Sequence, residues 1–350
     1  MNACDHGSGW PASLACARYS AIASSIASAL LAIAAHGADF IPQDQPIADG
    51  GPAPRPTWTA AVDAMMLWQA NAQSVPLFLD SNGATAFDAQ DLGTQMGAGA
   101  RGVLQRSFGA CHAIEGVYFQ ARPFNAESDL SPFGGPYELT NTGDLVFNDI
   151  EAARITSSGW IQSAECNWRA RRPDSPLVWI AGFRWVELNS NILVDYSFAN
   201  PDPYGSGSIL SSCGNNLYGG QLGGDLLLWN NGGPIRVNCI GKAGLFYNSM
   251  AFQRSSAGFV VTDTGENFPL GTVSATADQT SFFGEIGLNA EYRLTSWLSW
   301  RVGYSFFWAA GVAVAARQLP LNNFGDLTAS IDTGSNLFLH GVTTGIEARW

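Results

Sequence analysis

One histidine and several aspartates in the C-terminal half are the side chains best suited to acid–base chemistry. His340 is preceded by Asp332, and Asp278 lies further upstream, so these groups could form the general acid–base pair of a hydrolase. A single histidine near scattered acids is more typical of a polar surface than of a catalytic centre. Asp263 and Asp326 add candidate calcium ligands, but the acids lack the spacing of a calcium-binding loop. We therefore predict that the protein is not an enzyme and binds no metal.

No other chemical motif is visible in the chain. It has no phosphate-binding loop and no glycine-rich nucleotide fingerprint between a strand and a helix. Four of the six cysteines lie after the first 38 residues: Cys111, Cys166, Cys213 and Cys239. They form no CxxC pair and are not closely spaced, so neither a zinc site nor a redox motif is indicated. The sequence therefore predicts no cofactor.

The composition disfavours both a typical cytosolic enzyme and a helical membrane protein. Only 13% of the residues are charged, against roughly 25% in soluble domains, while 12% are aromatic and 39 are glycine. After residue 40, no stretch approaches the ~20 apolar residues that a transmembrane helix requires. A membrane β-barrel fits, because its lipid-facing residues alternate with lumen-facing ones. The formal net charge of −12 excludes a nucleic-acid binder that neutralises phosphates.

The N-terminal region predicts export. Arg18 precedes an apolar run of small residues, and Ala32–Ala34 offers an A-x-A cleavage site, with cleavage after Ala38 nearly as plausible. We assign 1–38 to a signal peptide. Residues 39–57 are rich in proline and glycine and are interpreted as a periplasmic tether. The remainder, 58–350, is the predicted barrel.

Period-2 alternation of apolar residues predicts about ten strands. Their approximate ranges are 58–68, 94–107, 111–121, 159–169, 177–187, 216–229, 234–247, 280–294, 297–311 and 338–350. The long connections between them are 69–93, 122–157, 188–213, 248–278 and 312–337, and all the others are tight. Long and tight connections alternate without a break. This pattern predicts an all-β, up-and-down antiparallel transmembrane β-barrel with short periplasmic turns and long extracellular loops.

The two faces of the strands agree with a barrel in lipid. Between Leu298 and Trp308, large apolar side chains alternate with smaller or charged ones. Tryptophans lie near strand ends, as Trp160 and Trp168 do, which is typical of the aromatic girdles at the two membrane interfaces. The chain ends on a strand with charges on one face and with Trp350 as its last residue. This strand resembles the closing strand of bacterial outer-membrane barrels, whose terminal aromatic is an assembly signal.

Several stretches, in their order along the chain, resemble the planctomycete family of outer-membrane β-barrel proteins. They are Val62–Trp68, Cys111–Phe119, Trp179–Leu188, Asn216–Trp229, Gly241–Asn248, Gly284–Leu288, Tyr304–Val312 and His340–Glu347. The resemblance covers roughly residues 58–350. It implies a barrel fold and an outer-membrane location but no reaction, because members of this family have no assigned activity.

Assigning faces strand by strand predicts a set of charged side chains that point into the lumen. They are Asp63, Arg101, Glu115, Glu165, Arg169, Arg184, Asp225, Arg236, Lys242, Glu285, Glu291, Arg293, Arg301, Glu347 and Arg349. Seven acids face eight bases, although the whole chain is acidic. A buried charge without a partner costs several kcal/mol, so this near balance predicts pairing between strands.

The number of strands sets the width of the barrel and therefore predicts whether these charged side chains fill the lumen. Barrels of about eight strands are just wide enough for side chains to fill, whereas wide channels need about sixteen to eighteen strands. We therefore predict a non-enzymatic outer-membrane barrel, filled by its charge network, with a structural or surface-interaction role. The alternatives are a narrow pore for small solutes or ions and, more distantly, a surface hydrolase. The expected partners are the lipid bilayer and the outer-membrane assembly machinery, and no loop ligand can be named.

Overall fold

The computed structural model describes residues 57–70, 74–130, 135–139, 150–173, 175–198, 206–261, 267–269, 271–319 and 329–350. The predicted signal peptide and residues 39–56 of the predicted tether lie outside these residues. Among the described residues, no helix is long and apolar enough to cross a membrane.

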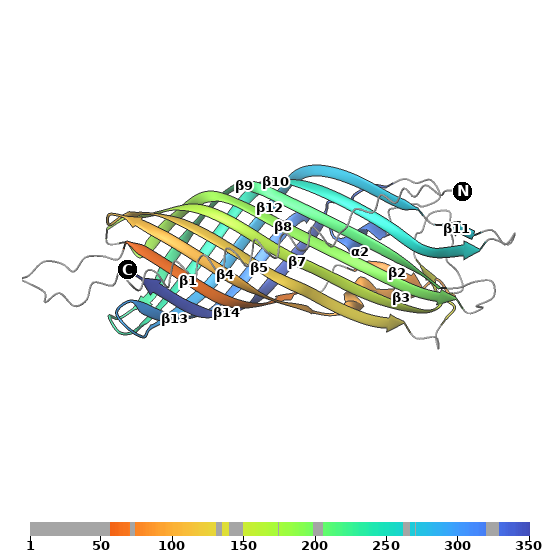
Figure 1. The fold of residues 1–350 in the computed structure, drawn as a ribbon, viewed down its shortest axis with the longest axis horizontal. Coiled ribbons are helices and arrows are strands. Elements are labelled where there is room, and N and C mark those ends of the chain that lie inside the picture. The colour runs from red at the N-terminus through yellow and green to blue at the C-terminus, as the bar shows by residue number, and fades with distance from the viewer. Residues whose placement is uncertain are drawn as a thin grey trace, which may run out of the picture.

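Within the described residues, ten antiparallel strands form a closed barrel (Figure 1). They are β1 (Trp58–Gln69), β4 (Gln95–Phe108), β5 (His112–Leu130), β7 (Ile150–Arg171), β8 (Leu177–Phe198), β9 (Ser206–Asn230), β10 (Ile235–Val261), β12 (Thr272–Arg293), β13 (Leu298–Val312) and β14 (Ser335–Arg349). Each strand pairs with its neighbours in this order, and β14 pairs with β1 to close the ring. The predicted fold class is confirmed.

The seam between β1 and β14 depends on backbone contact as well as on side chains. Val62 lies opposite Ile346, and Trp68 lies opposite His340. At Gly341 the two backbones are so close that a Cβ atom would lie 1.9 Å from the carbonyl oxygen of Met66. Glycine is therefore required there for the strands to approach each other. At the end of the seam, the carbonyl of Trp350 accepts hydrogen bonds from the amides of residues 57 and 58.

The two ends of the barrel differ. The tight turns and the start of β1 lie at the same end as Trp350 (Figure 1, left), which is the periplasmic end of such barrels. Two of these turns contain glycines with positive φ, Gly109 and Gly232, as tight reversals require. At the other end, smaller elements are inserted between strands. They are β2 (Pro76–Leu79), β3 (Thr85–Asp88), the 3-10 helix η2 (Ala89–Leu92), β6 (Glu138–Leu139), β11 (Asn267–Pro269) and the short helix α2 (Ala315–Gln318).

Three predicted loops are wrong, because most of 122–157, 188–213 and 248–278 is strand. In place of these loops, β5, β7, β8, β9, β10 and β12 continue as strands toward the extracellular end (Figure 1). The alternating pattern weakens there because the outer face becomes polar, as at Asn191 and Asp195. The inner face stays apolar, as at Ile192 and Val194, and the strands remain paired. Backbone hydrogen bonding between the strands therefore extends the barrel wall beyond the residues whose apolar alternation predicts a strand.

Large apolar side chains form a belt around the outside of the barrel. Trp179 on β8, Leu222 on β9, Leu245 on β10 and Ile346 on β14 are all more than half exposed. Exposed apolar side chains in such number are costly in water and stable in lipid. Beyond Tyr218 and Tyr247 the outer face turns polar, so the belt ends before the strands do. The barrel therefore spans a membrane and extends beyond it on the extracellular side.

Candidate functional site

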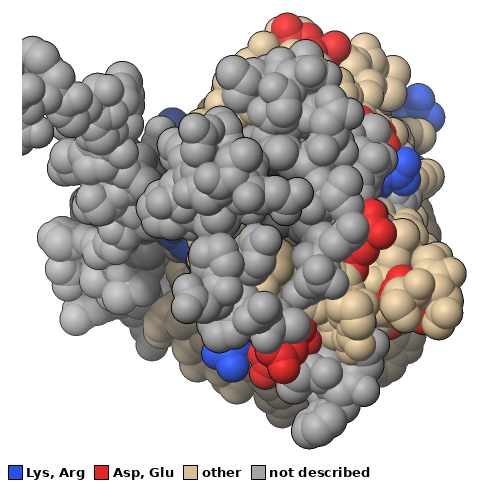
Figure 2. Space-filling model, turned by 90° about the vertical axis from the view of Figure 1, so that its right-hand side faces the viewer, with Lys and Arg blue, Asp and Glu red and all other residues tan. Residues whose placement is uncertain are grey.

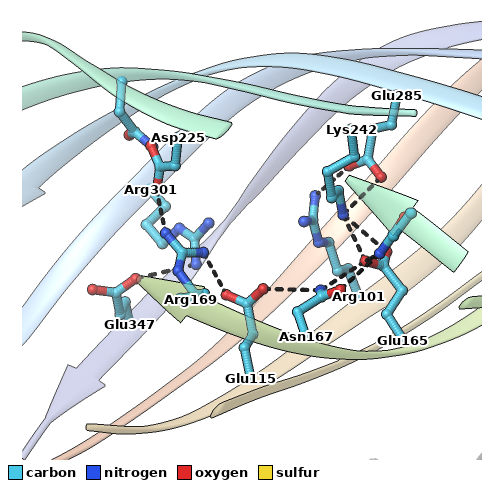
Figure 3. Close-up of polar contacts among 12 residues, drawn as sticks. Arg101, Glu115, Glu165, Asn167, Arg169, Asp225, Lys242, Glu285, Arg301 and Glu347 are labelled. Atoms are coloured by element: carbon cyan, nitrogen blue, oxygen red, sulfur yellow. Dashed lines mark hydrogen bonds and ion pairs between the residues drawn. The ribbon is translucent and has the colours of Figure 1, made fainter. Parts of the chain in front are cut away.

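The centre of the lumen holds a five-residue ion cluster, which we call the deep cluster. It consists of Arg101, Glu165, Arg184, Lys242 and Glu285, contributed by β4, β7, β8, β10 and β12. All but Arg184 are labelled in Figure 3. Successive residues of a strand point to opposite faces of the wall, and each of these five is at a position that faces the lumen. Their side chains are at most 9% exposed. Residues far apart in sequence thus meet on the barrel axis.

Glu285 is the most connected member of the deep cluster. Its Oε2 lies 2.9 Å from Nη1 of Arg184 and 3.0 Å from Nζ of Lys242, and its Oε1 lies 3.5 Å from Nη1 of Arg101. Glu165 completes the cluster, with Oε2 at 2.8 Å from Lys242 Nζ and Oε1 at 3.5 Å from Arg184 Nη1. Two carboxylates therefore hold three cations in a region shielded from water.

Uncharged amides connect the charged groups, and the charge-based prediction did not include them. Asn167 Nδ2 donates to Glu165 Oε2 at 2.9 Å and to Glu115 Oε1 at 3.3 Å. Gln221 Nε2 donates to Glu165 Oε2 and to Asn167 Oδ1, both at 2.7 Å. The position of Asn167 could have been predicted from the sequence, because it shares its strand face with Glu165 and Arg169.

A second group of charges lies nearer the periplasm. Arg169 binds Glu115 at 2.6 Å and also pairs with Asp225. Asn238 Nδ2 donates to Asp225 Oδ1 at 2.7 Å. The arginine thereby bridges strands β5 and β9 across the lumen, as the stick view shows (Figure 3).

The opposite wall carries a parallel set of pairs from β1, β12, β13 and β14. Arg301 Nη1 lies 3.2 Å from Glu347 Oε2, and its Nε lies 3.9 Å from Asp63 Oδ1. Arg349 lies 2.6 Å from Glu291 Oε2 and also pairs with Glu347. These contacts reach across the seam that closes the barrel.

Two predicted network members stand apart. The side chain of Arg236 on β10 makes no ion pair or hydrogen bond with the described residues, and its Nε is buried without a partner. Arg293 is exposed at the rim, where it donates to the carbonyl of Gly233 at 3.0 Å. The inward assignment of Arg293 is therefore wrong, because the strand reaches its turn there and the side chain leaves the lumen.

Phenylalanine rings cover the extracellular side of the deep cluster. Phe119, Phe246, Phe283 and Phe307 are at most 2% exposed, and the centroids of Phe119 and Phe307 lie 5.2 Å apart. The guanidinium of Arg184 lies 4.5 Å from the Phe283 ring centroid and 5.7 Å from that of Phe119. Such cation–π contact stabilises a desolvated cation. The rings and the ions therefore form one continuous packed layer across the lumen.

The segment after β13 enters the extracellular half of the lumen. The side chain of Asn215 pairs twice with the backbone of Ala313, at 2.7 Å and 2.8 Å. The hydroxyl of Ser190 accepts from the amide of Ala315 at 3.3 Å, and Arg254 Nη1 donates to the carbonyl of Leu319 at 3.0 Å. Burial lowers the pKa of Arg254 to about 10, which still leaves it charged at neutral pH. We call residues 313–319 the inner strap.

Cavities lie on both sides of the packed layer. The periplasmic one has a volume of about 280 Å³ and is lined by charged residues that include Arg169, Arg236 and Arg301. We call it the vestibule. On the extracellular side, cavities of about 230 Å³ and 30 Å³ adjoin the inner strap, and Gln95, Ser190 and other residues line both of them.

The candidate catalytic residues are not brought together. His340 lies on the outer face of β14, where its Nδ1 is 2.7 Å from the hydroxyl of Tyr304 and its ring stacks with Trp68. Asp332 instead pairs with Arg317 at 2.7 Å, and Asp278 is exposed on the outer face of β12. In the described part of the chain, no group of three or more His, Cys, Asp or Glu residues could hold a metal ion.

The four cysteines after the leader are free thiols in the structure. Cys166 is exposed and Cys239 is partly exposed on the outer face of the wall, while Cys213 is buried. Cys111 lies at the periplasmic turn between β4 and β5.

No protein-family model matches the chain. No curated protein matches it either. Among solved structures, the chain is similar to the outer membrane protease OmpT from Escherichia coli. The alignment covers 84% of this chain and 97% of the protease chain, with 9% identity and a TM-score of 0.47. The alignment with the translocator domain of the autotransporter NalP from Neisseria meningitidis covers 97% of this chain and 100% of that domain, with 8% identity and a TM-score of 0.35.

The alignment with a mutant of the TodX monoaromatic hydrocarbon channel covers 85% of this chain and 91% of the channel chain, with 9% identity and a TM-score of 0.35. A protease, a translocator and a channel differ in activity, and at these values the similarity assigns none of them to this chain. The described residues themselves have an even number of antiparallel barrel strands, tight turns at one end and an apolar outer belt. These are the features of bacterial outer-membrane barrels. The chain is an outer-membrane β-barrel.

Proposed function

We propose that the protein is a non-conducting outer-membrane barrel with a structural or surface-contact role at its extracellular end. The observation that supports this most directly is the packed layer across the lumen, in which Arg184 and Glu285 contact each other and the phenylalanines cover them. The proposal assigns no catalytic role to His340. Membership of the planctomycete barrel family stays a prediction.

The layers on either side of the deep cluster support a closed lumen. An ion that enters from the vestibule meets side chains with almost no exposed surface, and it would have to displace paired charges to pass. Beyond them lie the phenylalanines and then the inner strap, whose backbone is held by Asn215. A conduction path would need all three layers to move.

The extracellular end supports a surface role. Its strands continue beyond the apolar belt and enclose an apolar core in which Ile155, Ile192, Tyr196 and Phe252 are buried. Acidic and basic side chains are visible around the rim of this end (Figure 2). Arg154 on β7 pairs with Asp129 on β5, and both side chains are exposed. A rigid wall projecting from the membrane is suited to presenting surface to the environment.

A narrow pore is the second candidate, because cavities lie on both sides of the packed layer. Planar-bilayer recording of the purified protein separates the two functions, with a general porin reconstituted in parallel as the positive control. We expect no single-channel steps from this protein under conditions in which the porin conducts. Steady steps with ion selectivity would refute the closed lumen.

A further inference from the structure

We infer that the vestibule binds a small periplasmic anion that carries a carboxylate or phosphate group together with a hydroxyl group. The vestibule lies at the end with the tight turns, and its volume of about 280 Å³ corresponds to about nine water molecules at ~30 Å³ each. That is room for a small metabolite and too little for a folded partner. This inference goes beyond the proposed function and does not depend on it.

The pairing of charges around the vestibule leaves Arg236 without an acid. Four acids line the cavity, and other arginines hold each of them: Arg169 holds Glu115 and Asp225, and Arg349 pairs with Glu291 and Glu347. Arg236 also lines the cavity and makes no ion pair with the described residues. The lumen charges balance in number, but their geometry leaves this guanidinium available.

Unpaired polar atoms surround the same space. The Nε of Arg236 is buried without a hydrogen-bond partner, as are the Nε of Arg301 and the Oδ1 of Asn238. Asn238 is 8% exposed and two residues from Arg236 on the same face of β10, so the two side chains are neighbours. Buried polar atoms that lack partners cost free energy unless a water or ligand satisfies them.

The chemistry of these atoms defines the ligand. A guanidinium fork recognises a carboxylate or a phosphate through two parallel hydrogen bonds. The hydrogen bond from Asn238 Nδ2 to Asp225 fixes the orientation of the amide, so the group left without a partner is its oxygen. An amide oxygen can only accept, and it therefore requires a donor such as a hydroxyl. One molecule with both groups would satisfy both side chains.

Glu291 is the competing partner for Arg236. It lies directly opposite Arg236 in the pairing of β10 with β12, and its Oε2 is engaged by Arg349 at 2.6 Å. Because Arg349 engages Glu291, the guanidinium of Arg236 stays free for a ligand. The experiment must therefore test Arg236 itself.

The test is isothermal titration of the full-length barrel in detergent micelles, with citrate and glycerol 3-phosphate as probes. We expect at least one of them to bind at one site, and Arg236→Gln to weaken that binding by about tenfold or more, which is ~1.4 kcal/mol. Which probe binds identifies a carboxylate or a phosphate ligand. Tricarballylate, which is citrate without its hydroxyl, should bind more weakly than citrate if citrate is the probe that binds.

The matched control is Arg293→Gln, which removes an arginine at the same rim but outside the cavity lining and should leave binding unchanged. Heat-modifiable gel migration verifies that each variant folds. The absence of binding by either probe, or equal binding by the wild type and the Arg236→Gln variant, would overturn the inference. Equal binding of citrate and tricarballylate would overturn the role of the hydroxyl.

Discussion

Glu285→Gln should destabilise the barrel more than Arg184→Met, although both remove charges from the same deep cluster. Glu285 contacts Arg101, Arg184 and Lys242, and it is the one ion-pair partner that the described residues provide for Arg101. Without its charge, Arg101 is a buried cation with no ion pair. Without Arg184, in contrast, Glu165 keeps Lys242, and Glu285 keeps both Lys242 and Arg101.

The magnitudes follow from these partners. Leaving a buried charge without its partner costs about 3–5 kcal/mol, so Glu285→Gln should lower the free energy of unfolding by that amount. Arg184→Met leaves no orphaned charge and places an apolar side chain against Phe119 and Phe283. Its cost should be limited to the lost cation–π and ion-pair contacts, which is roughly 1–2 kcal/mol. The expected difference is at least about 1 kcal/mol, which is roughly a fivefold change in the unfolding equilibrium constant.

Urea unfolding of the protein in phospholipid vesicles, followed by tryptophan fluorescence, measures both costs. The control is Arg154→Gln, which breaks pairs with Asp129 and Glu127 that are more than half exposed and should cause no measurable change. The double variant Arg101→Met/Glu285→Gln should recover part of the loss, because it removes the orphaned cation. If Glu285→Gln costs no more than Arg184→Met, the argument from orphaned charge is wrong.

Three further predictions concern the seam, the orientation and a buried thiol. Deletion of Trp350 should reduce assembled, heat-modifiable protein far more than Arg317→Gln, because it removes the carbonyl that closes the seam; equal yields would remove its role in assembly. Cysteines introduced at Asn231 or Ser296 should react with an impermeant reagent only after the outer membrane is opened, and labelling on intact cells would invert the orientation. Burial raises the pKa of the Cys213 thiol to about 12, so it should resist alkylation at pH 8 in the folded protein. Because the unfolded thiol ionises near pH 9, its stabilising effect is complete below that pH and is lost as the pH rises toward 12. Cys213→Ala should flatten this decline in a urea-unfolding series, and an unchanged slope would contradict it.

The sequence alone was sufficient for the fold class and for the side of the wall that the barrel charges face, except at Arg293, where the strand ends in its turn. Alternation of residues requires only near neighbours, so Glu165 and Arg184 could be assigned to the lumen without knowing their partners. The alternation of tight and longer connections likewise requires no three-dimensional information. The same alternation, applied to His340, places it on the lipid side with Val342 and Ile346, and this argues against a catalytic pair with Asp332.

The lengths of the strands could not be obtained in this way. The signal used was apolar alternation on the outer face, and it ends where the wall leaves the lipid. Strands β8 and β9 continue beyond that point because their backbones remain paired and their inner faces, with Val194 and Ile209, cover an extracellular core. Burial of an inner face against inserted segments such as the inner strap is a tertiary property.

Only the tertiary structure determined which charges meet. Arg184 on β8 contacts Glu285 on β12 across the lumen, and that distance depends on the diameter and stagger of the whole ring. The same geometry leaves Arg236 unpaired while Arg349 takes Glu291, although Arg236 lies directly opposite that glutamate. A count of seven acids and eight bases predicts balance but not partners. The physical reason is that strand alternation fixes the face of a side chain locally, whereas ion pairing depends on distances that exist only once the barrel has closed.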